Sequence, residues 1–115
     1  MISFDELKNI MTNIDLRNLY CLEFDFCVLG KDNYSKCKIG KRPQKVLKNN
    51  CYLYWLSLEE NNIRLFLSFD EMVSSKIFEG LSFKELWNKI EIRKEDEKNT
   101  EKYFSSLLEK ANIYR

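Results

Sequence analysis

Hydrophobic and polar side chains alternate along two neighbouring stretches of the chain, 51–58 and 63–69, and the polar residues 59–62 separate them. An alternation with a period of two is typical of strands buried on one face, so these stretches predict a β-hairpin. Two turn registers fit, and both give the same core face, because a shift of two residues preserves the direction of the side chains. The predicted core face comprises Tyr52, Tyr54, Leu56, Leu58, Ile63, Leu65, Leu67 and Phe69.

The opposite face of this hairpin carries Leu53 and Trp55 on the first strand and Arg64 and Phe66 on the second. It is too apolar for an ordinary solvated surface. One interpretation is that a helix or a neighbouring chain covers it. The other is that Trp55 and Phe66 anchor a protein partner, with Arg64 beside them, because aromatic residues and Arg dominate binding hot spots.

The stretch 18–29 shows the clearest alternation, and its less hydrophobic face carries Glu23 and Asp25. Because these residues are two apart, both carboxylates project from the same face of a strand. Paired carboxylates can transfer protons or bind a cation, but the sequence supplies neither a third acidic ligand nearby nor any histidine. We therefore expect a solvated outer face, or the acidic part of a partner-binding surface that also contains Trp55 and Phe66.

Three Ser-x-x-Glu sequences, at 3–6, 68–71 and 82–85, have the form of a capping box, which marks the start of a helix. Together with apolar residues at helical spacing they predict helices in four places: 4–13, 70–78, 83–90 and 100–112. The last helix either covers the second face of the sheet, which we favour, or extends toward a partner.

These elements predict the fold class. The expected strands are 18–29, 45–58 and 63–68, with 36–39 as a fourth. The connections are short, which favours a meander. We expect one α+β domain, residues 1–115, in which N-terminal and C-terminal helices pack on an antiparallel sheet of three or four strands.

The composition limits the chemistry that the chain can perform. Its 115 residues include no histidine, which removes the usual general base near neutral pH, the Ser-His and Cys-His nucleophile pairs and the commonest metal ligand. The four cysteines, Cys21, Cys27, Cys37 and Cys51, lack the C-x₂₋₄-C spacing of zinc sites. We therefore expect no enzyme activity, no metal and no cofactor.

The charge and hydropathy of the chain indicate in which cellular compartment the protein lies. The formal net charge is +1, no apolar run approaches the ~20 residues that cross a bilayer, and the N-terminus lacks the pattern of a secretion signal. These features predict a cytoplasmic protein without membrane contact, whose cysteines are reduced.

Between residues 30 and 48 the chain is rich in basic residues, with Asp32 as the single acidic residue. The candidate basic site comprises Lys36, Lys38, Lys41, Arg42 and Lys45. Clusters of Lys and Arg contact phosphates, so this segment suggests a small nucleic-acid-binding protein as the alternative function. Only Tyr34 offers a ring for stacking on bases, and we favour a solvated loop or a contact for an acidic protein.

In the segment 68–90 a Phe-x-Glu-Met sequence precedes Ile-Phe-x-Gly and a short stretch with Glu-Leu-Trp. The residues concerned are Phe69, Glu71, Met72, Ile77, Phe78, Gly80, Ser82, Glu85 and Trp87. The segment resembles a region near the C-terminus of small bacterial toxin-immunity proteins of the contact-dependent inhibition type. Such proteins typically lie in the cytoplasm and bind a cognate toxin domain, blocking its active site or an essential surface. The resemblance implies a non-catalytic protein-binding module that neutralises a toxin by occlusion.

Overall fold

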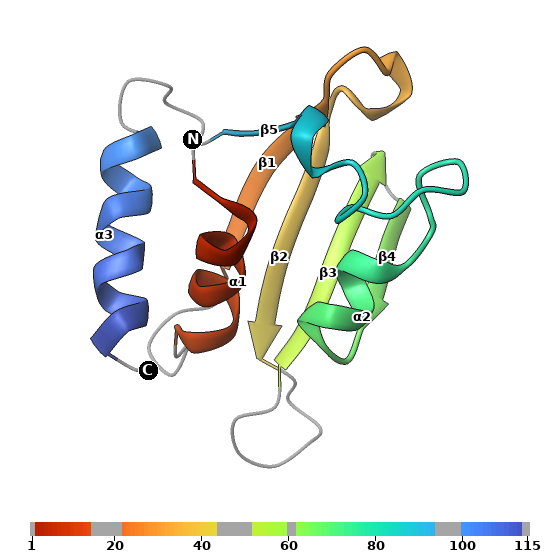
Figure 1. Cartoon of the computed structure of the whole chain (residues 1–115). Coiled ribbons are helices and arrows are strands. Elements are labelled where there is room, and N and C mark those ends of the chain that lie inside the picture. The colour runs from red at the N-terminus through yellow and green to blue at the C-terminus, as the bar shows by residue number, and fades with distance from the viewer. Residues whose placement is uncertain (1, 15–21, 44–51, 60–61, 94–99, 114–115) are drawn as a thin grey trace.

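The alternating stretches form one antiparallel sheet, and helices lie in front of it in Figure 1. The structure, a computed structural model, describes residues 2–14, 22–43, 52–59, 62–93 and 100–113. Its strands, in the spatial order β4-β3-β2-β1-β5, are β1 Leu22–Val28, β2 Cys37–Pro43, β3 Tyr52–Glu59, β4 Asn62–Phe66 and β5 Ile90–Arg93. Its helices are α1 Phe4–Asn13, α2 Phe69–Ser74 and α3 Thr100–Ile113, with the 3₁₀ turns η1 Asp32–Tyr34 and η2 Trp87–Lys89.

The predicted α+β class, with an antiparallel sheet and helices at both ends of the chain, is confirmed. Strands β1 to β4 form the expected meander, and the predicted strand residues 18–21 and 45–51 lie outside the described residues. The sheet has five strands because Ile90–Arg93 pairs antiparallel with β1. The helix predicted over 83–90 is wrong: turns and η2 occupy it, and Ile90 and Ile92 alternate into the core as strand residues.

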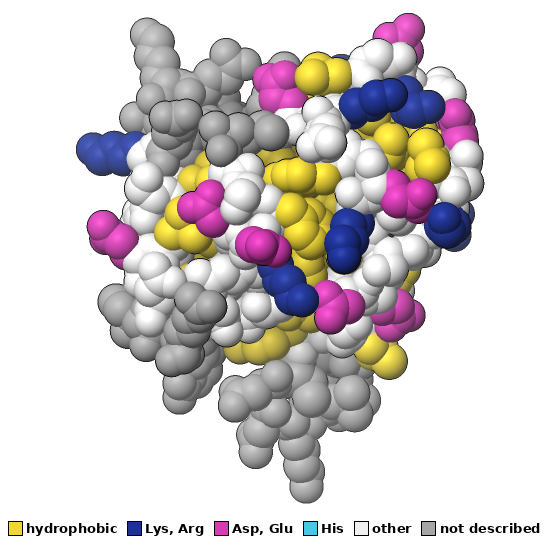
Figure 2. Space-filling view, viewed as in Figure 1, with side chains coloured by type: hydrophobic (Ala, Val, Ile, Leu, Met, Phe, Trp, Pro, Cys, Tyr) yellow, Lys and Arg dark blue, Asp and Glu magenta, His cyan; other side chains and the backbone are white. Residues whose placement is uncertain are grey.

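The helices pack on the same face of the sheet. From α1, Leu7, Ile10 and Met11 are fully buried. Helix α3 lies beside α1, and Asn9 of α1 donates a hydrogen bond of 3.0 Å to Asn112 of α3. Helix α3 also packs on the sheet, where the centre of the Phe104 ring lies 5.1 Å from that of Phe24 in β1. The expectation that α3 covers the second face is therefore wrong. Charged side chains of both signs are spread over the helix-covered side (Figure 2).

The capping sequences act as predicted at the first two sites. Ser3 and Glu6 form a reciprocal capping box at α1, and the Ser68 hydroxyl accepts the backbone N–H of Glu71 at the start of α2. Ser82 and Glu85 also form both bonds of a box, although only turns and η2 follow. Hydrogen bonds from Lys76 and Ser82 hold the pKa of Glu85 below its ordinary value.

The hairpin of β3 and β4 differs from its predicted register. Glu59 faces Asn62 next to the turn, as one of the two predicted registers requires, but a bulge between Ser57 and Glu59 then sets Ser57 opposite Ile63. A bulge places an extra residue in one strand, and a one-residue shift sends every following side chain to the other face. The predicted core face of β4 is therefore wrong: Ile63 and Leu65 are exposed, and Phe66 is buried.

Candidate protein-interaction surface

The second face of the sheet, turned away from the helices, gathers side chains from four neighbouring strands. We call it the open face. In register, Leu65, Trp55, Gly40 and Glu23 form one row across it, and Ile63, Ser57, Lys38 and Asp25 form the next. The open face further includes Cys27, Arg42 and Leu53. It is thus apolar on β3 and β4 and charged on β1 and β2.

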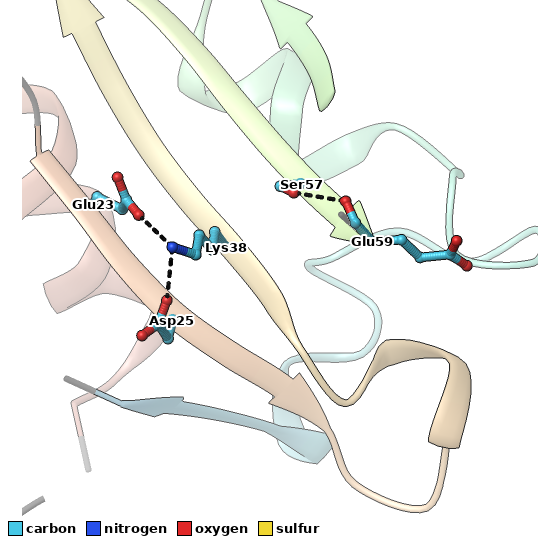
Figure 3. A network of polar contacts seen from close by, with 5 residues as sticks. All are labelled: Glu23, Asp25, Lys38, Ser57 and Glu59. Atoms are coloured by element: carbon cyan, nitrogen blue, oxygen red, sulfur yellow. Dashed lines mark hydrogen bonds and ion pairs between the residues drawn. The ribbon is translucent and has the colours of Figure 1, made fainter. Parts of the chain in front are cut away.

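The charged half of the open face is organised by one lysine. Lys38 Nζ lies 3.0 Å from Glu23 Oε1 and 3.8 Å from Asp25 Oδ1, between the two carboxylates (Figure 3). All three side chains are substantially exposed, so each pair contributes at most about 1 kcal/mol to stability. The carboxylates project together, as the sequence predicts, but an ammonium group from the next strand accompanies them.

The apolar half is centred on Trp55. Its indole lies over Gly40 of β2, where a Cβ atom would come within 2.5 Å of Trp55 Cε2. Trp55 is half-buried by this contact, whereas Ile63 is 58% and Leu65 50% exposed. Because Gly40 lies directly between Trp55 and Glu23 in register, the absence of a side chain on β2 brings the tryptophan toward the acidic strand. Trp55 therefore lies on the same face of the sheet as Glu23 and Asp25, with β2 between them.

Two of the five predicted partner-binding residues lie elsewhere. Phe66 is 9% exposed and belongs to the core, and Arg64 is exposed but stands opposite Leu56, on the helix-covered side of β4. Sequence reasoning missed Ile63 and Leu65 as open-face residues. Their alternation was visible, but the bulge that decides their face has no sequence signal of its own.

The predicted basic residues do not form one surface among the described residues. Lys41 is completely buried. Its Nζ donates hydrogen bonds of 2.6 Å to the backbone oxygens of Met11 and Ile14 and lies 4.4 Å from the centre of the Tyr52 ring. Lys38 pairs with carboxylates. Lys36 and Arg42 are exposed at different ends of β2, and the other predicted member, Lys45, lies outside the described residues. The assignment of Lys41 to an accessible basic site is wrong, because it stabilises the C-terminus of α1.

The two described cysteines lie on opposite faces of the sheet. Cys37 is buried and its Sγ donates to the backbone oxygen of Leu58 over 3.3 Å, whereas Cys27 is half-buried on the open face. Burial raises the pKa of Cys37 from 9.0 to about 11, with smaller contributions from Cys27 and Glu59. This is the opposite of the lowered pKa that an activated thiol needs. Cys21 and Cys51 lie outside the described residues.

The pKa of Cys37 predicts slow modification of this thiol. A shift from 9.0 to about 11 lowers the thiolate fraction at neutral pH about 100-fold. We expect N-ethylmaleimide to label Cys27 before Cys37 in the native protein at pH 7, as peptide mapping by mass spectrometry would measure. The unfolded chain loses the Cys37 proton near pH 9 and the folded chain near 11, so this thiol's contribution to stability falls as pH rises through that range. Equal labelling of the two native thiols would contradict the prediction.

Comparison with known proteins found no matching family model, and no curated protein or solved structure is significantly similar to this chain. Within the described ranges, no helix is both long and apolar enough to cross a membrane. The described side chains likewise contain no group of three or more carboxylates or thiols that could hold a metal ion.

Proposed function

We propose that this chain is a non-catalytic protein-binding module that contacts its partner through the open face. The observation that carries the proposal is the exposure of Ile63 and Leu65 beside the half-buried Trp55, on a sheet face without a covering helix among the described residues. Charged residues, with Lys38 between Glu23 and Asp25, border this apolar area. An apolar centre with an aromatic anchor and a polar border is the usual anatomy of a protein interface.

We further propose a toxin domain as the partner, neutralised by occlusion of its active site or of an essential surface. The similarity of residues 68–90 to toxin-immunity proteins supports this. Four of the nine residues that carry it are buried and therefore structural: Phe69, Met72, Phe78 and Ser82. They form α2 and the turns on the helix-covered side, so they support the fold, and the open face supplies the contact.

The experiment uses the protein encoded directly upstream of this chain in its native genome, purified and titrated calorimetrically. We expect the unmodified chain to bind it and to suppress its toxicity on co-expression. Leu65→Glu places a charge at the centre of the contact and should weaken binding at least tenfold, since buried apolar anchors dominate interface energies.

The matched control is Leu81→Glu, which introduces the same charge at an exposed leucine in the turn after Phe78, whose ring packs against Phe26 on the helix-covered side. It should leave binding unchanged. The proposal fails if the upstream protein does not bind, or if Leu65→Glu and Leu81→Glu bind equally well.

A further inference from the structure

Strand β4 is an edge of the sheet, and Figure 1 shows it at the outer end beyond β3. Its residues pair with β3, and no backbone hydrogen bond joins 62–66 to any other segment that the structure describes. Within the described residues, the backbone N–H and C=O groups on the side of β4 that faces away from β3 therefore have no partner strand. Such an edge is a template for another strand, and proteins usually protect it with proline, lysine or a covering element.

Strand β4 contains neither proline nor lysine, and its one charged side chain is Arg64. Ile63 and Leu65 project from the open face, and Leu67, immediately after the strand, is 69% exposed. Arg64 projects from the opposite face of β4 and is exposed. Its guanidinium group donates a long hydrogen bond of 3.5 Å to Asn62 Oδ1 and forms no ion pair with the other described residues. The sequence thus offers an apolar, a basic and an apolar position in succession along an open edge.

We infer that β4 accepts an extended segment of the partner as a sixth strand, and that this segment alternates apolar, acidic and apolar residues. The inference rests on the proposed function and specifies its partner. In a sheet, residues directly opposite each other share a face. The residue opposite Arg64 therefore needs a carboxylate, and its two neighbours extend the apolar surface of Ile63, Leu65 and Trp55. Strand addition supplies affinity through the backbone and specificity through alternate side chains.

A second copy of β4 fits this edge less well. The antiparallel register that sets Ile63 opposite Leu65 also sets the two Arg64 side chains opposite each other, and like charges in that position are destabilising. The register that sets Leu65 opposite Leu65 faces Arg64 with Phe66, which is buried in the core. Neither arrangement gives the guanidinium an acidic partner.

The test uses fluorescein-labelled peptides with blocked ends: Ser-Leu-Glu-Leu-Glu-Leu-Ser, the same peptide with Lys for Glu, and a scrambled peptide, Ser-Glu-Leu-Leu-Leu-Glu-Ser. Fluorescence anisotropy should show the alternating Glu peptide binding about fivefold or more tightly than the Lys peptide, as expected for one cross-strand ion pair. Arg64→Glu should reverse this preference. Lys102→Glu is the matched control, since Lys102 is exposed on α3, which packs on β1 at the helix-covered side, three strands from β4, and should leave the preference intact.

Amide hydrogen exchange locates the peptide: exchange within 62–66 should slow when it binds. The inference is overturned if no peptide binds, if the scrambled peptide binds as tightly, if Arg64→Glu does not alter the preference, or if a dimer protects 62–66 without peptide. Titration of the upstream protein separates the two proposals. If Leu65→Glu weakens binding of the upstream protein and Arg64→Glu does not, strand addition alone is overturned. If the upstream protein does not bind although the peptide does, the proposed function alone is overturned.

Discussion

Replacement of Lys41 by alanine is expected to lower the free energy of unfolding by about 3–5 kcal/mol, which is a large part of the stability of an ordinary domain. Lys41 is fully buried, and its ammonium group binds the backbone oxygens of Met11 and Ile14. These carbonyls lie at the C-terminus of α1, where the last backbone oxygens have no partner within the helix and attract a positive charge. The substitution removes both bonds and leaves a cavity in the core.

A second substitution separates the loss of the hydrogen bonds from the loss of side-chain volume. Lys41→Met keeps most of the volume of the side chain and removes the ammonium group, so we expect a smaller loss of about 1–3 kcal/mol for the unsatisfied carbonyls. Tyr54 also donates to Met11, over 3.3 Å, and limits the loss at that oxygen. Burial raises the pKa of Tyr54, so it keeps this proton at neutral pH.

Urea denaturation followed by circular dichroism measures both variants, with Lys36→Ala as the control. Lys36 is exposed, and its replacement should change stability by less than about 0.5 kcal/mol. Amide exchange at the C-terminal turn of α1 should accelerate in Lys41→Met. A Lys41→Ala protein as stable as the unmodified chain would contradict the assigned role.

Substitution of Gly40 by alanine is expected to displace Trp55 and to cost about 1–3 kcal/mol of stability. The new Cβ would lie within 2.5 Å of Trp55 Cε2 and 2.8 Å from the backbone oxygen of Leu22, and contacts this short force atoms to move. The indole can move outward into solvent, whereas the backbone of β1 cannot move without loosening the sheet. The same substitution should weaken partner binding, because it disturbs the centre of the open face.

Tryptophan fluorescence reports this displacement in a Trp87→Phe background, in which Trp55 is the only tryptophan. The emission should shift to longer wavelength on Gly40→Ala. A double-mutant cycle with Trp55→Ala isolates the contact: without the indole, Gly40→Ala should cost at least about 1 kcal/mol less. An unchanged spectrum, or equal costs in the two backgrounds, would show that Trp55 does not lie over Gly40.

Local sequence signals predicted much of the fold because they act within a few residues. Ser3 and Glu6 start α1 through bonds between neighbours along the chain. The alternation in β1 buries Leu22, Phe24 and Phe26 and leaves Glu23 exposed, as expected. The signal for β5 was too short, since only Ile90 and Ile92 alternate, and its pairing depends on the exposed edge of β1.

The candidate surface was predicted only in part. The placement of Glu23 and Asp25 on one face follows from strand geometry and was correct, and the register of β1, β2 and β3 places Trp55 on that same face. The assignment of Phe66 failed at a single bulge between Ser57 and Glu59. The assignment of Lys41 failed because composition does not show which lysine lies beneath a helix end.

By itself the sequence determined the α+β class, most helix starts and the side-chain alternation within each strand, because these depend on backbone geometry and near neighbours. Only the tertiary structure decided which face of the sheet the side chains of β4 occupy, that the helices share one side, and that Lys41 lies inside. Those outcomes depend on contacts between residues distant along the chain, such as Lys41 with Met11 and Gly40 with Trp55, whose geometry the packed sheet sets.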